Sequence, residues 1–248
     1  MTAPRLELRD LSKRFGSVIV ADGLSLTVPP NQALGIVGPN GAGKSTLFAM
    51  ISGELNPDRG TVLLDGVDVT RHRADVRAAH GIGRTFQIPR PFEGMTVFEN
   101  VLVYATAAAG LRKAEAYRLA AATLERCGLG DVANRPAGAL GLLNRKRLEV
   151  ARALGSNPQL LLLDEVAGGL TDPEVALLVD LVNGLKAEGL TVVWIEHVVH
   201  ALLASVDRLA CLAGGRLVAD GDPDDVLKDP SVRDLYLGHA GVLEEDLQ

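Results

Sequence analysis

The sequence predicts an α/β fold, in which a core of mixed sheet and flanking helices carries a small antiparallel β subdomain and a helical subdomain. The first third of the chain alternates short β-patterned runs with turns. Residues 98–154 follow a helical pattern with Ala-rich stretches, and from residue 160 onward short apolar strands alternate with helical stretches. We therefore expect a single domain over 1–248, with core segments at 1–88 and 155–248 and a helical subdomain inserted at about 89–154.

The opening residues contain the runs that we expect to form the antiparallel sheet and the strand that leads from it into the core. Turn-forming residues separate these runs, most clearly in Asn56-Pro57-Asp58-Arg59-Gly60. The runs are Leu6–Leu8, Leu24–Val28, Ala33–Val37 and Val62–Asp65.

The last third of the chain is expected to form βαβ units, and therefore a parallel sheet. Its predicted strands are Leu160–Leu163, Thr191–Ile195 and Arg208–Leu212. Its predicted helices are Pro173–Ala187 and Val198–Ala204, followed by two short helices within 222–238.

The composition argues against several classes of protein. The net charge is −6 and no dense Lys/Arg run occurs, so we expect no nucleic-acid partner. The longest apolar stretches, such as Val101–Leu111, are shorter than the roughly 18 residues that a membrane span needs, so any membrane association should come through a partner. The first ten residues mix charged and apolar side chains, unlike a signal peptide, which indicates a chain in the cytosol.

The two cysteines, Cys127 and Cys211, lie in mainly apolar stretches. They lack the paired spacing of a disulfide framework or a metal site. We expect both to be reduced thiols in the core.

A phosphate-binding loop is predicted at Gly38-Pro39-Asn40-Gly41-Ala42-Gly43-Lys44-Ser45, which matches GxxxxGK[ST] between an apolar strand and a helical stretch that starts at Thr46. Its glycines let backbone N–H groups turn toward phosphate oxygens, and the helix N-terminus adds its positive end. Lys44 is expected to reach the β- and γ-phosphates of ATP, and the Ser45 hydroxyl to hold Mg²⁺. A chance Gly-rich turn would match in only about one per cent of chains of this length.

Two carboxylates, Asp164 and Glu165, follow the apolar strand Leu160–Leu163. Ligands of a parallel sheet bind at the carboxyl ends of its strands. We therefore expect Asp164 at the Mg²⁺ ion and Glu165 at the water that attacks the γ-phosphate. The alternative is an ordinary acidic turn after a strand, which the nearby phosphate-binding loop disfavours.

One histidine, His197, follows the strand Thr191–Ile195 on the same expected edge of the sheet. A lone histidine in such a place is more often structural than catalytic. The phosphate-binding loop and the carboxylate pair favour a role for it at the nucleotide.

These anchors, in this order and with Gln87 after the strand Gly83–Phe86, resemble the nucleotide-binding domain of ABC transporters over essentially the whole chain. The resemblance implies a P-loop NTPase core with a RecA-like mixed sheet, and hydrolysis of ATP with Mg²⁺ that is coupled to transport. It also implies that Glu165 is the general base, that His197 grips the γ-phosphate, and that Gln87 touches Mg²⁺ and senses the membrane subunit.

The resemblance further implies an adenine contact and a set of partners. Phe15, in Ser12-Lys13-Arg14-Phe15-Gly16, would stack on adenine, although a single aromatic near a strand is usually a packing residue. The implied partners are a second nucleotide-binding subunit, integral membrane permease subunits and, through the complex, an extracytoplasmic substrate-binding protein. The chain would then lie at the cytoplasmic face of the membrane.

Within the family, Gly83–Gln87 followed by Pro91–Val101 is similar to the ATP-binding subunits of branched-chain amino-acid importers, as is the closing Tyr236-Leu237-Gly238. Importers of urea, amides and aromatic acids share these features, so the cargo stays open. Phe92–Val101 is also explained as a loop that enters an amphipathic helix, and both interpretations can hold. An exporter ATPase is an alternative; so is a non-transport ABC ATPase, although no coiled-coil insertion or basic arm is evident.

The sequence departs from the family pattern where a stretch close to LSGGQ should face the partner's ATP. Here Leu140-Gly141-Leu142-Leu143-Asn144 precedes the basic helix Arg145–Arg152. Gly141 replaces the serine, and Leu143 brings a side chain to a position where glycine would let the backbone approach phosphate. Val166 and Thr171 also replace the usual proline and aspartate after the carboxylates.

This departure motivates the hypothesis of a heterodimer with two unequal ATP sites. The chain's own phosphate-binding loop would face the partner's intact signature, and its weakened signature would face the partner's loop. An equally weighted alternative is that the backbone N–H groups of Gly141 and Leu142 still suffice.

Overall fold

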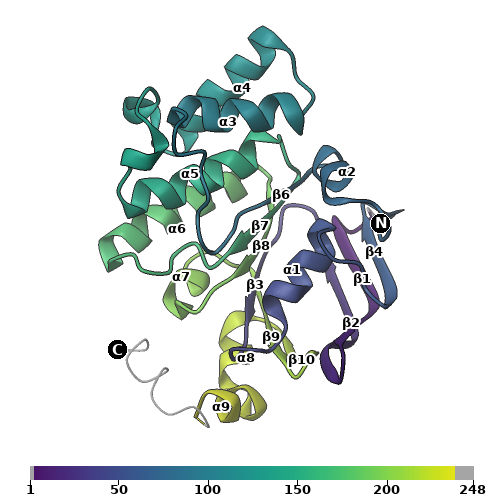
Figure 1. The fold of residues 1–248 in the computed structure, drawn as a ribbon. Helices are drawn as coiled ribbons and strands as arrows, with labels where there is room; N and C mark the ends of the chain where they lie inside the picture. Colours follow the sequence, from purple (N-terminus) through teal and green to yellow (C-terminus); the bar gives the residue numbers. More distant parts are fainter. Residues whose placement is uncertain (1–2, 238–248) are drawn as a thin grey trace.

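The computed structural model describes residues 3–237 and contains two sheets with helices around them (Figure 1). The six-stranded sheet has the order β10-β9-β3-β8-β7-β6, and the four-stranded sheet the order β2-β1-β4-β5. The α/β fold predicted from the sequence is confirmed. The limits of a separate helical subdomain at 89–154 stay a prediction.

The six-stranded sheet is parallel except at one edge, where β10 pairs antiparallel with β9. The inner strands β3, β7 and β8 are buried at every residue, because both faces of the sheet are covered. The strands are β3 (Ala33–Val37), β6 (Ile82–Arg84), β7 (Leu160–Asp164), β8 (Thr191–Ile195), β9 (Arg208–Ala213) and β10 (Arg216–Gly221).

The edge strand β10 was not predicted. Its side chains alternate between half-buried and exposed, so it lacks the continuous apolar run of its neighbours. The signal for it is the turn before it, because Gly214 and Gly215 both have positive φ and form a two-residue hairpin loop.

The antiparallel sheet consists of β1 (Leu6–Phe15), β2 (Val18–Val28), β4 (Arg59–Leu64) and β5 (Val67–Asp68). Its first two strands are longer than the runs predicted from the sequence. The pairing of β1 with β2 shifts register between Leu8 and Leu11, and Asp10 has a φ of 50° at this irregularity. Such a bulge breaks the strict alternation of apolar and polar residues by which a strand is recognised.

The nine α-helices of the described residues surround the six-stranded sheet, with α3 and α4 near the top of the view and α8 and α9 at the bottom (Figure 1). Of these, α2 was not predicted. The helices are α1 (Lys44–Ser52), α2 (Ala74–Ala79), α3 (Val97–Ala107), α4 (Lys113–Arg126), α5 (Leu142–Gly155), α6 (Asp172–Ala187), α7 (Val199–Leu203), α8 (Pro223–Lys228) and α9 (Pro230–Leu237). None of the helices within 3–237 is long and apolar enough to cross a bilayer.

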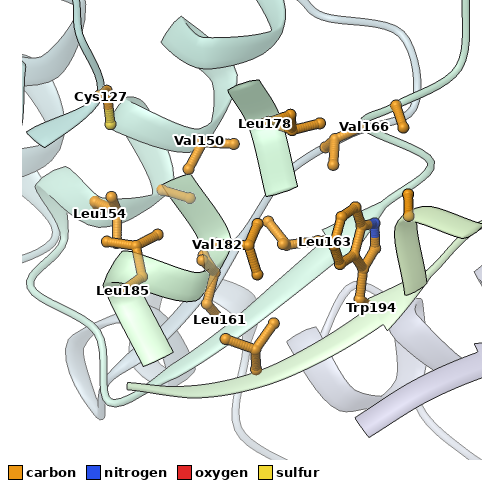
Figure 2. Close-up of a cluster of buried hydrophobic side chains, with 14 of the residues drawn as sticks. Cys127, Val150, Leu154, Leu161, Leu163, Val166, Leu178, Val182, Leu185 and Trp194 are labelled. Atoms are coloured by element: carbon orange, nitrogen blue, oxygen red, sulfur yellow. The ribbon is translucent and has the colours of Figure 1, made fainter. Parts of the chain in front are cut away.

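Alternate residues of the inner strands face two separate hydrophobic clusters. On one face, Leu161, Leu163 and Trp194 pack against residues of α5 and α6 (Figure 2). On the other face, Leu160 and Leu162 belong to a cluster with α1 and the antiparallel sheet. Both clusters contain side chains of β7 and β8, and β6 is hydrogen-bonded to β7. The carboxyl ends of these three strands are therefore held in fixed relative positions.

The C-terminus of α1 is capped by a buried arginine from α2. The Arg77 guanidinium is fully buried and donates to the carbonyls of Met50, at 2.6 Å, and Ile51, at 2.9 Å. It also donates to the carbonyls of Thr70 and His72. Burial lowers the pKa of Arg77 to about 10, so the side chain remains a cation at neutral pH. The positive charge therefore lies at the negative end of the helix.

Candidate functional site

The predicted phosphate-binding loop joins β3 to α1 and borders an open cavity of about 450 Å³. Side chains from the ends of β6, β7 and β8 complete the wall, because parallel strands end at one edge of the sheet. The residues that line the cavity are Asn40, Gly41, Ala42, Gly43, Lys44, Ser45, Thr46, Gln87, Glu165 and His197. Gly38 and Pro39, at the start of the loop, are not part of this lining.

Two glycines allow the loop to pass close to neighbouring backbone. Gly38 has a φ of 150°, and a Cβ there would lie 2.0 Å from the carbonyl oxygen of Leu212. Gly43 has a φ of 102°, and a Cβ there would lie 2.3 Å from the carbonyl oxygen of Val20. Gly43 is also the N-cap of α1 and, having no side chain, leaves the first N–H groups of the helix without a side-chain cap.

Lys44, the first residue of α1, is nearly buried below the loop. Its ammonium donates to the carbonyls of Gly38, at 2.6 Å, and Pro39, at 3.1 Å. Burial lowers the pKa of Lys44, while the carboxylates of Glu165 and Asp164 oppose that shift. The site therefore places one cation beside two acidic side chains.

Glu165 is held at the end of β7 in an unusual backbone conformation, with a φ of 47°. Its N–H donates to the carbonyl of Ile195, at 2.9 Å. The carboxylate accepts a hydrogen bond from Nε2 of Gln87, and its other oxygen lies 2.8 Å from Nε2 of His197. Positive φ in a residue other than glycine is strained and concentrates at functional sites.

Asp164 is buried beside Glu165, and one of its oxygens lacks a hydrogen-bond partner among the described residues. Oδ2 accepts from the Arg84 guanidinium at 3.2 Å, whereas Oδ1 is the buried unpartnered atom. Burial raises the pKa of Asp164, and the charge of Arg84 opposes that shift. An unpartnered carboxylate oxygen, the Ser45 hydroxyl and the Gln87 carboxamide oxygen fit the hard oxygen ligands that Mg²⁺ prefers.

Three charged residues that the sequence did not assign to the site support it: Lys146 and Glu196, which are buried, and Arg84, which is partly buried. Besides Arg84, the Lys146 ammonium donates to the carbonyls of Gln87, at 3.1 Å, and Glu165, at 3.0 Å. The carboxylate of Glu196 accepts from the N–H groups of Ala167, at 2.6 Å, and His197, at 3.2 Å. Burial lowers the pKa of Lys146 and raises that of Glu196. In the sequence, the only signal for these three residues was a charged side chain on a face of a helix or strand that is expected to be buried.

Phe15, the predicted adenine contact, ends β1 and is half exposed, outside the cavity lining. The ammonium of Lys13 lies 5.6 Å from the centre of its ring. The hairpin that Phe15 enters runs past the phosphate-binding loop, as the close approach of Val20 to Gly43 shows. Its stacking role stays a prediction.

Comparison with known proteins identifies the family of this site. The sequence pattern of the ABC transporter family matches residues 21–168, more than half of the chain. The chain belongs to the ABC transporter family. A second pattern, that of the branched-chain amino acid ATP-binding cassette transporter, matches residues 216–242. This match includes the predicted tail motif at 236–238, of which Gly238 lies outside the described residues.

Curated relatives are similar over nearly the full length. The branched-chain amino acid transport ATP-binding protein BraF of Pseudomonas aeruginosa is 36% identical, over 97% of this chain and 100% of the relative. LivG of Escherichia coli K12 is 35% identical with the same coverage. The lipopolysaccharide export ATP-binding protein LptB of Haemophilus influenzae is 33% identical, over 94% of this chain and 97% of the relative.

Solved structures agree with the fold. The ADP conformation of MJ1267, an ATP-binding cassette of an ABC transporter, superposes with a TM-score of 0.88 and 32% identity, over 96% of this chain and 100% of that chain. The present chain is thus an ATP-binding subunit that hydrolyses ATP to drive transport, as a component of an ABC transporter complex.

The segment predicted to be a degenerate signature lies at the start of α5, outside the lining of the cavity. Gly141 is the N-cap of the helix with a φ of −69°, and a Cβ there would meet nothing within 4 Å. The position therefore does not require glycine, and serine would fit. Leu142 is exposed, whereas Leu143 and Asn144 are half-buried. Arg145 fixes the segment by donating to the carbonyl of Leu140, at 2.9 Å.

The other two departures have structural explanations. Val166 is fully buried in the core cluster, where an apolar side chain fits. Thr171 is the N-cap of α6, and its N–H and hydroxyl both donate to the Glu174 carboxylate at 2.9 Å. Threonine thus serves as a cap in place of aspartate.

Proposed function

We propose that this ATPase powers an importer of branched-chain amino acids from the cytoplasmic face of the membrane. The observation that carries the proposal is the match of residues 216–242 to the branched-chain type of ATP-binding cassette. Overall identity does not separate import from export, because LptB is 33% identical and serves an export system. The full-length similarity to BraF and LivG adds support.

The proposed partners are a second nucleotide-binding subunit, permease subunits in the membrane and an extracytoplasmic binding protein. Purification of the native complex, followed by identification of the small molecule that its binding protein retains, tests this assembly. Leucine, isoleucine or valine would support the proposal. Copurification with an export apparatus, or with ribosomes or DNA and no permease, would contradict it.

The proposed nucleotide site uses the loop 38–46, in which every residue except Pro39 has a backbone N–H group, to surround the phosphates, with the Lys44 ammonium at the β- and γ-phosphates. Ser45, Gln87 and Asp164 would hold Mg²⁺, which neutralises negative charge on the phosphate oxygens when bound. Backbone groups and a helix N-terminus are suited to this purpose because they need no reorientation when an anion arrives.

The proposed hydrolytic step assigns Glu165 as the general base. Its carboxylate takes a proton from water while the water oxygen bonds to the γ-phosphorus and the bond from the γ-phosphorus to the bridging oxygen breaks. His197 donates a hydrogen bond to the γ-phosphate. Support comes from the position of the Glu165 carboxylate in the cavity wall, between the side chains of Gln87 and His197.

Replacement of Glu165 tests the step. Glu165→Gln keeps the shape of the side chain but removes the basic oxygen, so hydrolysis should fall by about 10²-fold or more while the affinity for ATP stays within a few-fold. Glu115→Gln, on the exposed surface of α4, is the matched control and should leave both unchanged. Full activity of Glu165→Gln would remove this residue from the base role.

A further inference from the structure

Lys146 lies on α5, the helix that begins at the predicted degenerate signature. Its side chain nevertheless reaches two loops beside the chain's own predicted nucleotide site. Its ammonium donates to the backbone carbonyl of Gln87, at 3.1 Å, and to that of Glu165, at 3.0 Å. The residue is only 4% exposed. These two carbonyls belong to loops that follow different strands, β6 and β7.

Burial of an ammonium group is unfavourable unless its donors are satisfied. Lys146 forms no ion pair with any of the residues that the structure describes, because no carboxylate lies within 4 Å of its nitrogen. Burial lowers its pKa, and the more distant carboxylates of Glu196 and Glu165 oppose that shift. The two carbonyls are therefore its direct partners, and the surrounding carboxylates favour its charged form.

The contacts form a closed ring. Lys146 holds the carbonyl of Gln87, the Gln87 carboxamide donates to the carboxylate of Glu165, and the carbonyl of Glu165 returns to Lys146. The N–H of Glu165 is held as well, by the carbonyl of Ile195. The N–H and the carbonyl of Glu165, whose backbone conformation is strained, are thus each hydrogen-bonded to another segment of the chain.

We infer that Lys146 is a positioning residue for ATP hydrolysis, which fixes the backbones of Gln87 and Glu165 relative to each other and to α5. The inference rests on the roles proposed above for these two residues. Lys146 does not line the cavity, so it acts through the groups it holds. A carboxylate displaced by about 1 Å loses on the order of 10²-fold in rate, which sets the size of the expected effect.

Three variants test the inference. Lys146→Met keeps the length of the side chain and removes its donors, whereas Lys146→Arg keeps donors that can reach both carbonyls. Lys186→Met is the matched control, because Lys186 also donates to a backbone carbonyl, that of Ser205 at 3.0 Å, but it lies in the last turn of α6 and outside the cavity lining. If Lys146→Met yields little folded protein, Lys146→Gln replaces it, since its shorter side chain cannot bridge both loops.

Two measurements are made on each variant. Hydrogen exchange followed by mass spectrometry reports the mobility of residues 85–92 and 164–170 independently of catalysis. Lys146→Met should raise the exchange rate in both segments about fivefold, the effect of one lost hydrogen bond on local opening. Single-turnover kinetics should show a rate lowered by about 10²-fold, an ATP Kd within about threefold of the wild type, and recovery in Lys146→Arg.

Other outcomes overturn the inference. Exchange that rises in one segment only, or a rate equal to that of Lys186→Met, would mean that Lys146 does not tie the two loops together. Failure of the proposed function is recognised separately, because then the wild-type rate would not depend on Glu165 at all. In that case the exchange data would still decide whether Lys146 ties the two loops together.

Discussion

Nε2 of His197 lies 2.8 Å from Oε1 of Glu165, and the carboxamide of Gln87 contacts the other oxygen of the same carboxylate. The two partners come from the ends of β8 and β6, on either side of β7. The sheet order therefore sets the geometry of the candidate base, since each side chain follows a strand hydrogen-bonded to β7. Neither partner would hold the carboxylate if the strands were in another order.

The contact with His197 predicts a loss of turnover on its removal. His197→Ala should lower the rate of hydrolysis by about 10²-fold, because the proposed hydrogen-bond donor to the γ-phosphate and a partner of Glu165 are lost together. Single-turnover assays measure the rate, and calorimetry should show ATP binding within a few-fold of the wild type. His200→Ala, at an exposed histidine on α7, should behave as the wild type. Equal rates for the two variants would rule out a catalytic role for His197.

The unpartnered oxygen of Asp164 predicts a specific effect on metal binding. Asp164→Asn should weaken ATP binding in the presence of Mg²⁺ by about tenfold or more, and leave ATP binding in EDTA unchanged. The reason is that the asparagine side chain is uncharged and has an NH₂ group in place of one of the two carboxylate oxygens of Asp164. Calorimetric titrations with and without EDTA separate the two contributions, and Asp180→Asn on the exposed face of α6 is the control. Equal losses in both buffers would indicate a folding defect.

The free space around Gly141 predicts that the signature can be repaired. Gly141→Ser combined with Leu143→Gly, in the assembled complex, should change turnover at the partner's site, because a hydroxyl and an open backbone are restored there. Site-specific rates follow when each subunit in turn carries Glu165→Gln or its equivalent. Gly141→Ser alone is the control for added helix capping, which stabilises by about 1 kcal/mol. Unchanged ATPase rates at both sites would favour the alternative in which the backbone amides suffice.

The guanidinium of Arg77 predicts a large effect on stability. Arg77→Met leaves the carbonyls at the end of α1 without their donors, so the free energy of unfolding should fall by about 3 kcal/mol. Urea titration measures this change. Arg73→Met is the control, because its ion pair with Asp75 is exposed and should contribute little. A loss below about 1 kcal/mol would mean that water replaces the guanidinium at these carbonyls.

The cysteines give a second measurement of the same change. Burial raises the pKa of Cys127 to about 12 and that of Cys211 to about 11, so almost no thiolate exists in the folded chain at pH 8. Both thiols are free and buried, as expected from the sequence. Alkylation should therefore proceed only through opening of the fold, and faster in Arg77→Met than in Arg73→Met.

The sequence contained the information for the core of the fold because strands buried on both faces appear as continuous apolar runs. The runs Leu160–Leu163 and Thr191–Ile195 were recognisable in this way, and the polar residues that follow them were expected at one edge of the sheet. In the structure Gln87, Glu165 and His197 do line one cavity. Their roles in hydrolysis remain predictions.

The supporting residues could not be found in the same way. Lys146 lies in a run of basic residues, which usually means a solvated helix face, and only tertiary packing shows that this one is buried. Arg84 is similar, since nothing in its neighbours along the chain indicates a contact with Asp164, 80 residues away. Charge partners distant in sequence depend on how strands are ordered, which local patterns do not encode.

Substitutions at the two ends of helix α1 should have different consequences. Its first turn carries Lys44 and Ser45, where a substitution should yield intact protein that fails to turn over. Its last turn rests on Arg77, where a substitution should reduce the amount of intact protein while leaving each surviving molecule competent. A growth screen that scores only uptake of an amino acid would mix these two classes, and quantifying the polypeptide by immunoblot would sort them.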